Sequence, residues 1–196
     1  MLDALKPKAC GRYADGTLGG AGHAASILAA SSPTGWLSGC DRDGVAVEAS
    51  KKRLAEKFAG RFDLRRGNFA ELTDWIVEKS CNGVLLDLGV SSPQLDTAER
   101  GFSFQLDGPL DMRMDNRQPL TAAELVNGED AETLAKIFWE LGGERESRRF
   151  ARAIVHDREQ RKFETTLQLA EMIERIFPRA GSFPPGCRGS SPATPA

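Results

Sequence analysis

The stretch Asp15-Gly-Thr-Leu-Gly-Gly-Ala-Gly-His23 decides how the first half of this chain is expected to fold. A glycine-dense turn has few Cβ atoms, so its backbone can approach a ligand closely. Helix-compatible residues follow at 24–30, so the turn is predicted to open a helix whose first N–H groups face that ligand. Asp41 stands 19 residues beyond Gly22, where an acid would bind ribose hydroxyls. The stretch therefore predicts a site for an adenosine-type cofactor.

Other interpretations of the glycines are open. A tight strand-to-helix turn followed by a surface Asp41 would leave the same pattern. An ATP-binding loop needs Gly-Lys followed by Ser or Thr, and no such tripeptide occurs. A nicotinamide oxidoreductase needs Gly-x-Gly-x-x-Gly, which the glycines at 16, 19, 20 and 22 do not match. An S-adenosylmethionine site needs an acid ahead of the glycines and no pyrophosphate cradle, and Asp15 meets that requirement.

The composition is typical of a globular protein. The chain has 196 residues, of which 40% are hydrophobic and 28% charged, with a net charge of −2. This balance gives no global attraction to nucleic acid, so any polyanion contact must come from a local patch. The four cysteines lack metal-ligand spacing, which predicts reduced thiols of a cytoplasmic protein and no metal. Neither a signal pattern nor an apolar run of membrane-spanning length occurs.

Residues 1–95 alternate short apolar runs with helical patterns, which predicts a parallel sheet flanked by helices. The predicted strands are Gly11–Ala14, Gly35–Cys40, Phe62–Arg65 and Gly83–Leu88. The predicted helices are Gly22–Ala30, Gly44–Phe58 and Phe69–Lys79. The fold class is thus a Rossmann-like α/β cofactor-binding part in the N-terminal half.

Three acids are predicted to share the edge of this sheet where ligands bind. Asp15, Asp41 and Asp87 follow three of the predicted strands. Ligands of open parallel sheets lie beyond the carboxyl ends of the strands. We therefore expect the three carboxylates to converge on one hollow. The run 84–88 is the most apolar strand, which is typical of a central one.

From residue 96 the pattern changes. Residues 96–116 lack periodicity, and two capping boxes, at Thr121–Glu124 and Thr165–Gln168, then start helices. Residues 96–177 are therefore predicted to form a loop plus a small helical domain. The proline- and glycine-rich segment 178–196 is predicted to be disordered.

A short polar motif, Asp87-Leu-Gly-Val-Ser-Ser-Pro-Gln94, follows the fourth predicted strand. Such a motif is common in methyltransferases that act on exocyclic amines, because acceptors for the amine N–H groups can orient a poor nucleophile. Asp87, Ser92 and the backbone at Pro93 are the candidate catalytic groups, with Ser91 and Gln94 as further acceptors. A plain Ser-Pro turn is the alternative.

These motifs, with Leu85-Leu-Asp-Leu-Gly-Val-Ser-Ser-Pro-Gln-Leu-Asp96 and Asp107-Gly-Pro-Leu-Asp-Met-Arg-Met-Asp115, resemble the ribosomal RNA small-subunit methyltransferase H family, also called MraW. The resemblance covers about residues 2–177. It implies methyl transfer from S-adenosylmethionine to N4 of a cytosine in 16S ribosomal RNA of the small subunit. It also implies a helical domain inserted after the fourth strand.

The resemblance implies that seven residues of this chain, matched by their positions in the motifs, contact the cofactor. Asp15 is an eighth candidate cofactor-binding residue, because it stands directly before the glycines. The seven are Ala21, Gly22, His23, Asp41, Phe69, Asp87 and Gln94. His23 could donate to the methionine carboxylate, Phe69 could border the adenine, and Asp41 could accept from both ribose hydroxyls. A capping histidine and a core phenylalanine are the plainer interpretations.

For the RNA, four arginines recur at helical spacing: Arg145, Arg148, Arg149 and Arg152. Residues 144–162 hold seven Lys/Arg and four Asp/Glu, so the segment could bind phosphates. The alternative is a solvated face that pairs with its own acids, such as Glu144 and Asp157.

The family continues with further strands that have no counterpart after Phe177, so the chain is expected to be C-terminally truncated. The fourth strand would then have an apolar, unpaired edge. A truncated non-catalytic remnant, which binds cofactor or RNA without turnover, is accordingly the alternative to an active methyltransferase.

Overall fold

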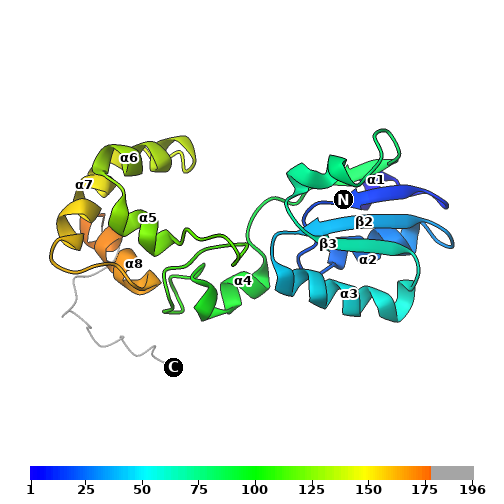
Figure 1. Cartoon of the computed structure of the whole chain (residues 1–196), viewed down its shortest axis with the longest axis horizontal. Helices are drawn as coiled ribbons and strands as arrows, with labels where there is room; N and C mark the ends of the chain where they lie inside the picture. The colour runs from blue at the N-terminus through cyan, green and yellow to red at the C-terminus, as the bar shows by residue number, and fades with distance from the viewer. Residues whose placement is uncertain (178–196) are drawn as a thin grey trace, which may run out of the picture.

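The computed structural model describes residues 1–177, in which a parallel sheet with its helices lies beside a group of further helices (Figure 1). The prediction for 178–196 falls outside the described residues. The elements of the sheet part are α1 Leu2–Leu5, β1 Arg12–Asp15, α2 Gly22–Ala30, β2 Trp36–Asp41, α3 Gly44–Phe58, β3 Phe62–Arg66, the 3-10 helix η1 Phe69–Asp74 and β4 Gly83–Leu85. Those that follow are α4 Ser92–Asp96, the 3-10 helix η2 Ala98–Arg100, α5 Ala122–Gly128, α6 Ala131–Glu140, α7 Ser147–Arg158 and α8 Thr166–Ile176.

The sheet has the strand order β3-β2-β1-β4, and all neighbours are parallel. The crossovers from β1 to β2 and from β2 to β3 run in the same direction across the sheet. The crossover from β3 to β4 runs back and places β4 on the other side of β1. Because such crossovers are right-handed, α2 and α3 lie together on one face, as Figure 1 shows, and the connection through η1 belongs to the other. The order therefore reverses between β1 and β4, where ligands of open α/β sheets bind.

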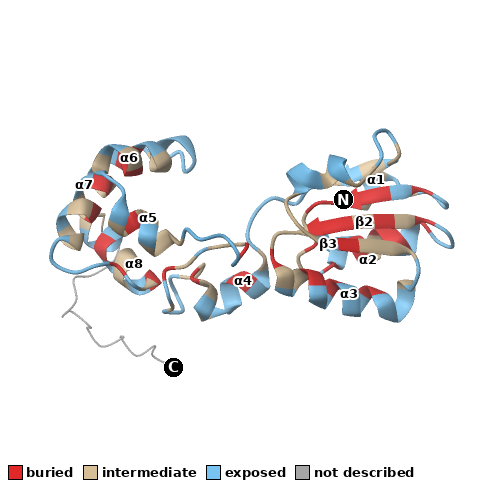
Figure 2. Ribbon diagram, in the orientation of Figure 1, coloured by how far each residue is buried: buried red, intermediate tan, exposed pale blue. Residues whose placement is uncertain are grey.

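Two separate clusters of buried side chains stabilise the two parts (Figure 2). The first lies between the sheet and its helices and includes Tyr13, Ile27, Leu28, Leu37, Leu54 and Leu64. The second lies among α5–α8 and includes Val126, Leu134, Ala151, Ile154, Phe163 and Met172. Both predicted capping boxes are present, at the starts of α5 and α8. Within residues 1–177 no helix is both long and apolar enough to cross a membrane.

The predicted helix Phe69–Lys79 is wrong. Only η1 forms, and it begins with Asn68 Oδ1 accepting from Ala70 N at 3.1 Å. Phe69 and Leu72 are three residues apart, a spacing that suits a 3-10 turn. The chain then turns, and Lys79 adopts a left-handed φ of 60°.

The fourth strand is shorter than predicted and lies at the edge of the sheet, so its predicted central position is wrong. Within the described residues β1 is the neighbour it pairs with. Its apolar run is consequently uncovered: Val84 is 56% exposed, and Leu86 and Leu88 are also exposed. The structure thus confirms the predicted apolar open edge.

Candidate functional site

A cavity of about 460 Å³ opens beyond the carboxyl ends of β1, β2 and β4. The glycine turn, residues 16–23, forms one wall, and the loop 87–94 forms another. Asp41, Arg42, Ala46, Phe69 and Met114 also line the cavity. The cavity therefore lies at the reversal of strand order that the topology singles out.

Asp41 lines the cavity, and two backbone N–H groups fix the position of its carboxylate. Its Oδ2 accepts from Gly19 N at 2.9 Å, and its Oδ1 accepts from Asp43 N at 2.9 Å. Each carboxylate oxygen has further acceptor capacity. Asp41 can thus accept hydrogen bonds from two adjacent hydroxyl groups of a ligand without moving.

Asp15 does not line the cavity, so the expectation that three carboxylates share one hollow holds only for Asp41 and Asp87. Asp15 is 0% exposed, and its Oδ1 accepts from Thr17 N at 3.0 Å. Burial raises the pKa of this carboxyl, although the Thr17 N–H opposes the shift. Thr17 Oγ1 in turn accepts from Asp87 N at 2.7 Å, so Asp15 braces the turn that supports Asp87.

The start of α2 faces the cavity without a side-chain cap. Its N-cap residue is Ala21, which is buried and left-handed, with a φ of 58°. Gly22 and His23 follow and line the cavity. Because Ala21 offers no acceptor, the first N–H groups of α2 are available to an anion. His23 Nδ1 also lies 3.7 Å from Asp87 Oδ2.

Phe69 borders the cavity where the glycine turn passes close to it. A Cβ placed on Gly16 would lie 2.7 Å from Phe69 Cβ and 2.5 Å from Leu86 Cδ2. Glycine is therefore required at this position for the turn to pack against the ring.

In the loop 87–94, the candidate acceptors differ in how available they are. Asp87 and Ser92 line the cavity. Pro93 does not, and its carbonyl already accepts from Thr97 Oγ1 at 2.7 Å. Gln94 lines the cavity but is only 6% exposed: its Oε1 accepts from Ser91 N and its Nε2 donates to Asp43 Oδ2.

Asp43 joins the sheet part to the loop 96–116 through Arg100. Its Oδ1 accepts from Val45 N and caps α3, and its Oδ2 accepts from Arg100 Nη1 at 2.5 Å. Burial raises the pKa of Asp43, but the hydrogen bonds from Arg100 and Val45 lower it by more. Arg100 Nη2 also donates to the carbonyls of Arg113 and Met114, at 3.0 and 3.2 Å.

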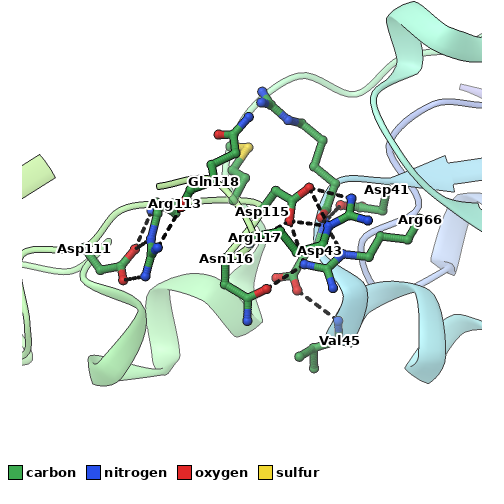
Figure 3. Close-up of polar contacts among 12 residues, drawn as sticks. Asp41, Asp43, Val45, Arg66, Asp111, Arg113, Asp115, Asn116, Arg117 and Gln118 are labelled. Carbon is green, nitrogen blue, oxygen red and sulfur yellow. Dashed lines mark hydrogen bonds and ion pairs between the residues drawn. The ribbon is translucent and has the colours of Figure 1, made fainter. Parts of the chain in front are cut away.

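A second ion-pair group lies beside it. Asp115 lies between Arg66 of β3 and Arg117, with contacts of 2.6 and 2.7 Å (Figure 3). The hydrogen bond from Arg117 opposes the effect of burial and holds the pKa of Asp115 far below its usual range. The two groups flank Met114 and so position it in the cavity. Sequence reasoning missed them, although Asp115 ends a motif it had singled out.

The four arginines are not all on one helix face as predicted. Because α7 begins only at Ser147, Arg145 lies in the preceding turn. Arg149 donates to the carbonyl of Ile176 and stacks on Phe177, with 4.3 Å to the ring centroid. All four nevertheless line one groove beside α6, and within residues 1–177 none of them forms an ion pair with an acid.

A parallel α/β sheet with a cavity beside a glycine turn at the carboxyl ends of its strands defines a Rossmann-like α/β protein. The sequence profile of the MraW methylase family matches residues 1–188, so the chain belongs to this family. The match extends past Phe177, where the sequence resemblance was expected to end.

Similar curated proteins have the name ribosomal RNA small subunit methyltransferase H. The one from Geobacter sulfurreducens is 52% identical over 182 residues, which cover 91% of this chain and 58% of that protein. Those from Syntrophotalea carbinolica and Stenotrophomonas maltophilia are 50% and 46% identical, and the match covers 57% and 55% of their lengths. The chain thus spans somewhat more than half the length of these relatives.

Proposed function

We propose that the chain binds S-adenosylmethionine and transfers its methyl group to N4 of a cytosine in 16S ribosomal RNA of the small subunit. The observation that carries the proposal is the single cavity that joins Asp41, the uncapped start of α2 and Asp87. Membership of the MraW family, and relatives named as ribosomal RNA methyltransferases, support it.

The residues around the cavity fit this cofactor. Asp41 would accept from the ribose hydroxyls, and Phe69 would border the adenine. The N–H groups of Gly22 and His23 would hold the methionine carboxylate, because the start of a helix favours an anion. When bound, the cofactor supplies a methyl group on a positively charged sulfur.

The loop 87–94 would orient the target amine. Asp87 and Ser92 line the cavity with side chains that can accept from the two N–H groups of cytosine N4. Alignment of two reacting groups can lower a barrier by roughly 7–11 kcal/mol in favourable cases. Asp87 Oδ2 can then take the proton that the amine loses, with His23 Nδ1 beside it. Pro93 and Gln94 contribute by shaping the loop, since their polar groups are already bonded.

Calorimetry would test the cofactor site. The wild-type chain should bind S-adenosylmethionine and not NAD, and Asp41→Ala should abolish the binding. Asp63→Ala is the matched control, because Asp63 lies on β3 and pairs with Arg65 away from the cavity. Equal binding by the Asp41→Ala variant would contradict the assignment.

Transfer would be measured with radiolabelled cofactor on small ribosomal subunits that lack the modification. Label in the RNA, lost in Asp87→Ala, supports the proposal. The second candidate function is binding of cofactor or RNA without turnover, which the open edge of β4 favours, because nothing among residues 1–177 covers the outer side of the 87–94 loop. Cofactor binding with no labelled RNA would select this candidate.

A further inference from the structure

The groove between α6 and α7 combines positive charge with an exposed aromatic ring. Its volume is about 860 Å³. The cationic and aromatic residues among those that line it are Lys136, Trp139, Arg145, Arg148, Arg149 and Arg152. Glu132 and Glu146 are the acids that also line it, so the groove is cationic. Figure 1 shows α6 and α7 at the end of the molecule away from the sheet, so this groove is distinct from the cavity at the strand ends.

The α6 side of the groove contributes a flat apolar surface. Trp139 is 56% exposed, although tryptophan is a large side chain that is mostly buried in folded proteins. The side of α6 that packs carries Leu134, in the second core cluster, and Phe138, which packs against it, whereas Ala135, one turn before Trp139, borders the groove. Lys136, one turn before Trp139, extends from the same exposed side. The indole face is thus available to a ligand.

The α7 side contributes cations that the protein leaves unpaired. Within residues 1–177, the side chains of Lys136, Arg145 and Arg148 have no hydrogen-bond or ion-pair partner, and Arg152 Nε donates only to the Arg148 carbonyl at 3.2 Å. Arg149 differs, because Ile176 and Phe177 hold it. Arg148 and Arg152 are therefore the pair on α7 that can contact two successive phosphates.

We propose that this groove binds single-stranded RNA, with one base stacked on Trp139 and its flanking phosphates on Arg148 and Arg152. Stacking requires a base face that a continuous duplex does not offer, whereas an unpaired strand presents both a base face and phosphates. The inference rests on the proposed function for its RNA partner. It adds an anchoring site for nucleotides that flank the reacting one, at a distance from the cavity.

The test uses the full chain and a fluorescently labelled RNA of about twelve unpaired nucleotides, with binding followed by anisotropy. Trp139→Ala should weaken binding by roughly 5- to 100-fold, and Trp139→Phe should restore most of it. The double variant Arg148→Gln/Arg152→Gln should reduce the slope of log Kd against log salt by roughly 1.4. Lys52→Gln/Lys57→Gln on α3 is the matched control and should bind as the wild type does.

The outcomes separate this inference from the proposed function. Because Trp139 is exposed, the melting curve of Trp139→Ala should match the wild type, so weaker binding would report the contact itself. Groove-dependent RNA binding without methyl transfer would support the inference and count against the proposed activity. Methyl transfer with unchanged RNA affinity in all groove variants would overturn the inference alone. Binding of heparin or duplex RNA as tight as that of the single strand would overturn it too.

Discussion

The ion pair between Arg100 and Asp43, which joins the sheet part to the loop 96–116, should be costly to break. Their side chains are 22% and 8% exposed, and the Arg100 Nη1–Asp43 Oδ2 distance is 2.5 Å. Removing one partner of such a buried pair costs about 3–5 kcal/mol, because the remaining charge is left uncompensated. Arg100 retains some contact with solvent, so we expect Arg100→Met to lower the free energy of unfolding by about 3 kcal/mol.

A double-mutant cycle isolates the pair. Asp43→Asn keeps an oxygen for Val45 N, which caps α3, removes the charge, and replaces the oxygen that accepts from Arg100 and Gln94 by an amide NH2. The double variant Arg100→Met/Asp43→Asn should lose less than the sum of the single losses, by about 2 kcal/mol. Lys51→Met, which breaks an exposed pair with Glu48 on the same helix, should change stability by no more than about 0.5 kcal/mol.

The pH dependence gives an independent check. The pKa of Asp43 is lower in the folded protein than in the unfolded chain, where a carboxyl of this type has a pKa of about 3.9. The stabilisation is therefore complete above that value and is lost as the pH falls through the folded pKa. In Arg100→Met this loss should be smaller, so the stability difference from the wild type should narrow as the pH falls below about 4.

Urea unfolding would measure these quantities in a Trp139→Phe background, where the remaining tryptophans, Trp36 and Trp75, lie in the sheet part. The reasoning would be refuted if Arg100→Met lost less than about 1 kcal/mol and the double variant lost the sum of the two single losses. A loss below about 1 kcal/mol is the range measured for exposed ion pairs.

Three further predictions follow from the turn and the open edge. Asp15→Asn should not destabilise the fold at pH 7. The pKa of Asp15 is raised, so the stabilisation that the protonated carboxyl contributes is lost as the pH rises through that pKa. Urea midpoints of the wild type and the variant at pH 4 and pH 7 would check this. Gly16→Ala should cost about 1–3 kcal/mol and weaken cofactor binding, because side chains already occupy the space of its Cβ. Gly22→Ala, with nothing within 4 Å of its Cβ, is the control, and equal effects of both variants would contradict the reasoning. Val84→Lys should reduce concentration-dependent association in analytical ultracentrifugation, because a charge on an edge strand opposes pairing, whereas Val77→Lys should leave it unchanged.

The sequence predicted best those elements whose signals are local. α2 and α3 have their predicted bounds to the residue, because their starts are marked by the glycine turn and by the Asp43 cap. The capping boxes of α5 and α8 are equally local. Where no such signal marks a boundary, the observed boundary differs from the predicted one, as at the end of β4 and at the start of α7.

The contacts that shape the cavity from outside could not be predicted in this way. Arg100 and Asp43 are 57 residues apart, and no periodicity connects them. Arg66 and Asp115 are 49 residues apart, and their pairing depends on where the loop 96–116 meets β3. The sequence indicated which charges were present but not which of them the fold would bring together.

The three acids show how neighbouring strands decide what a carboxylate does. Asp15 ends β1, which has a strand on each side, so the sheet buries its side chain and turns it into a brace. Asp41 ends β2 and is held by two backbone N–H groups at the cavity wall. Asp87 lies two residues beyond the edge strand β4, with its side chain exposed to the cavity. Asp87 thus combines an exposed side chain with a backbone that the turn holds through Thr17 Oγ1, and for this reason we propose Asp87, rather than Asp15 or Asp41, as the carboxylate that orients an incoming base.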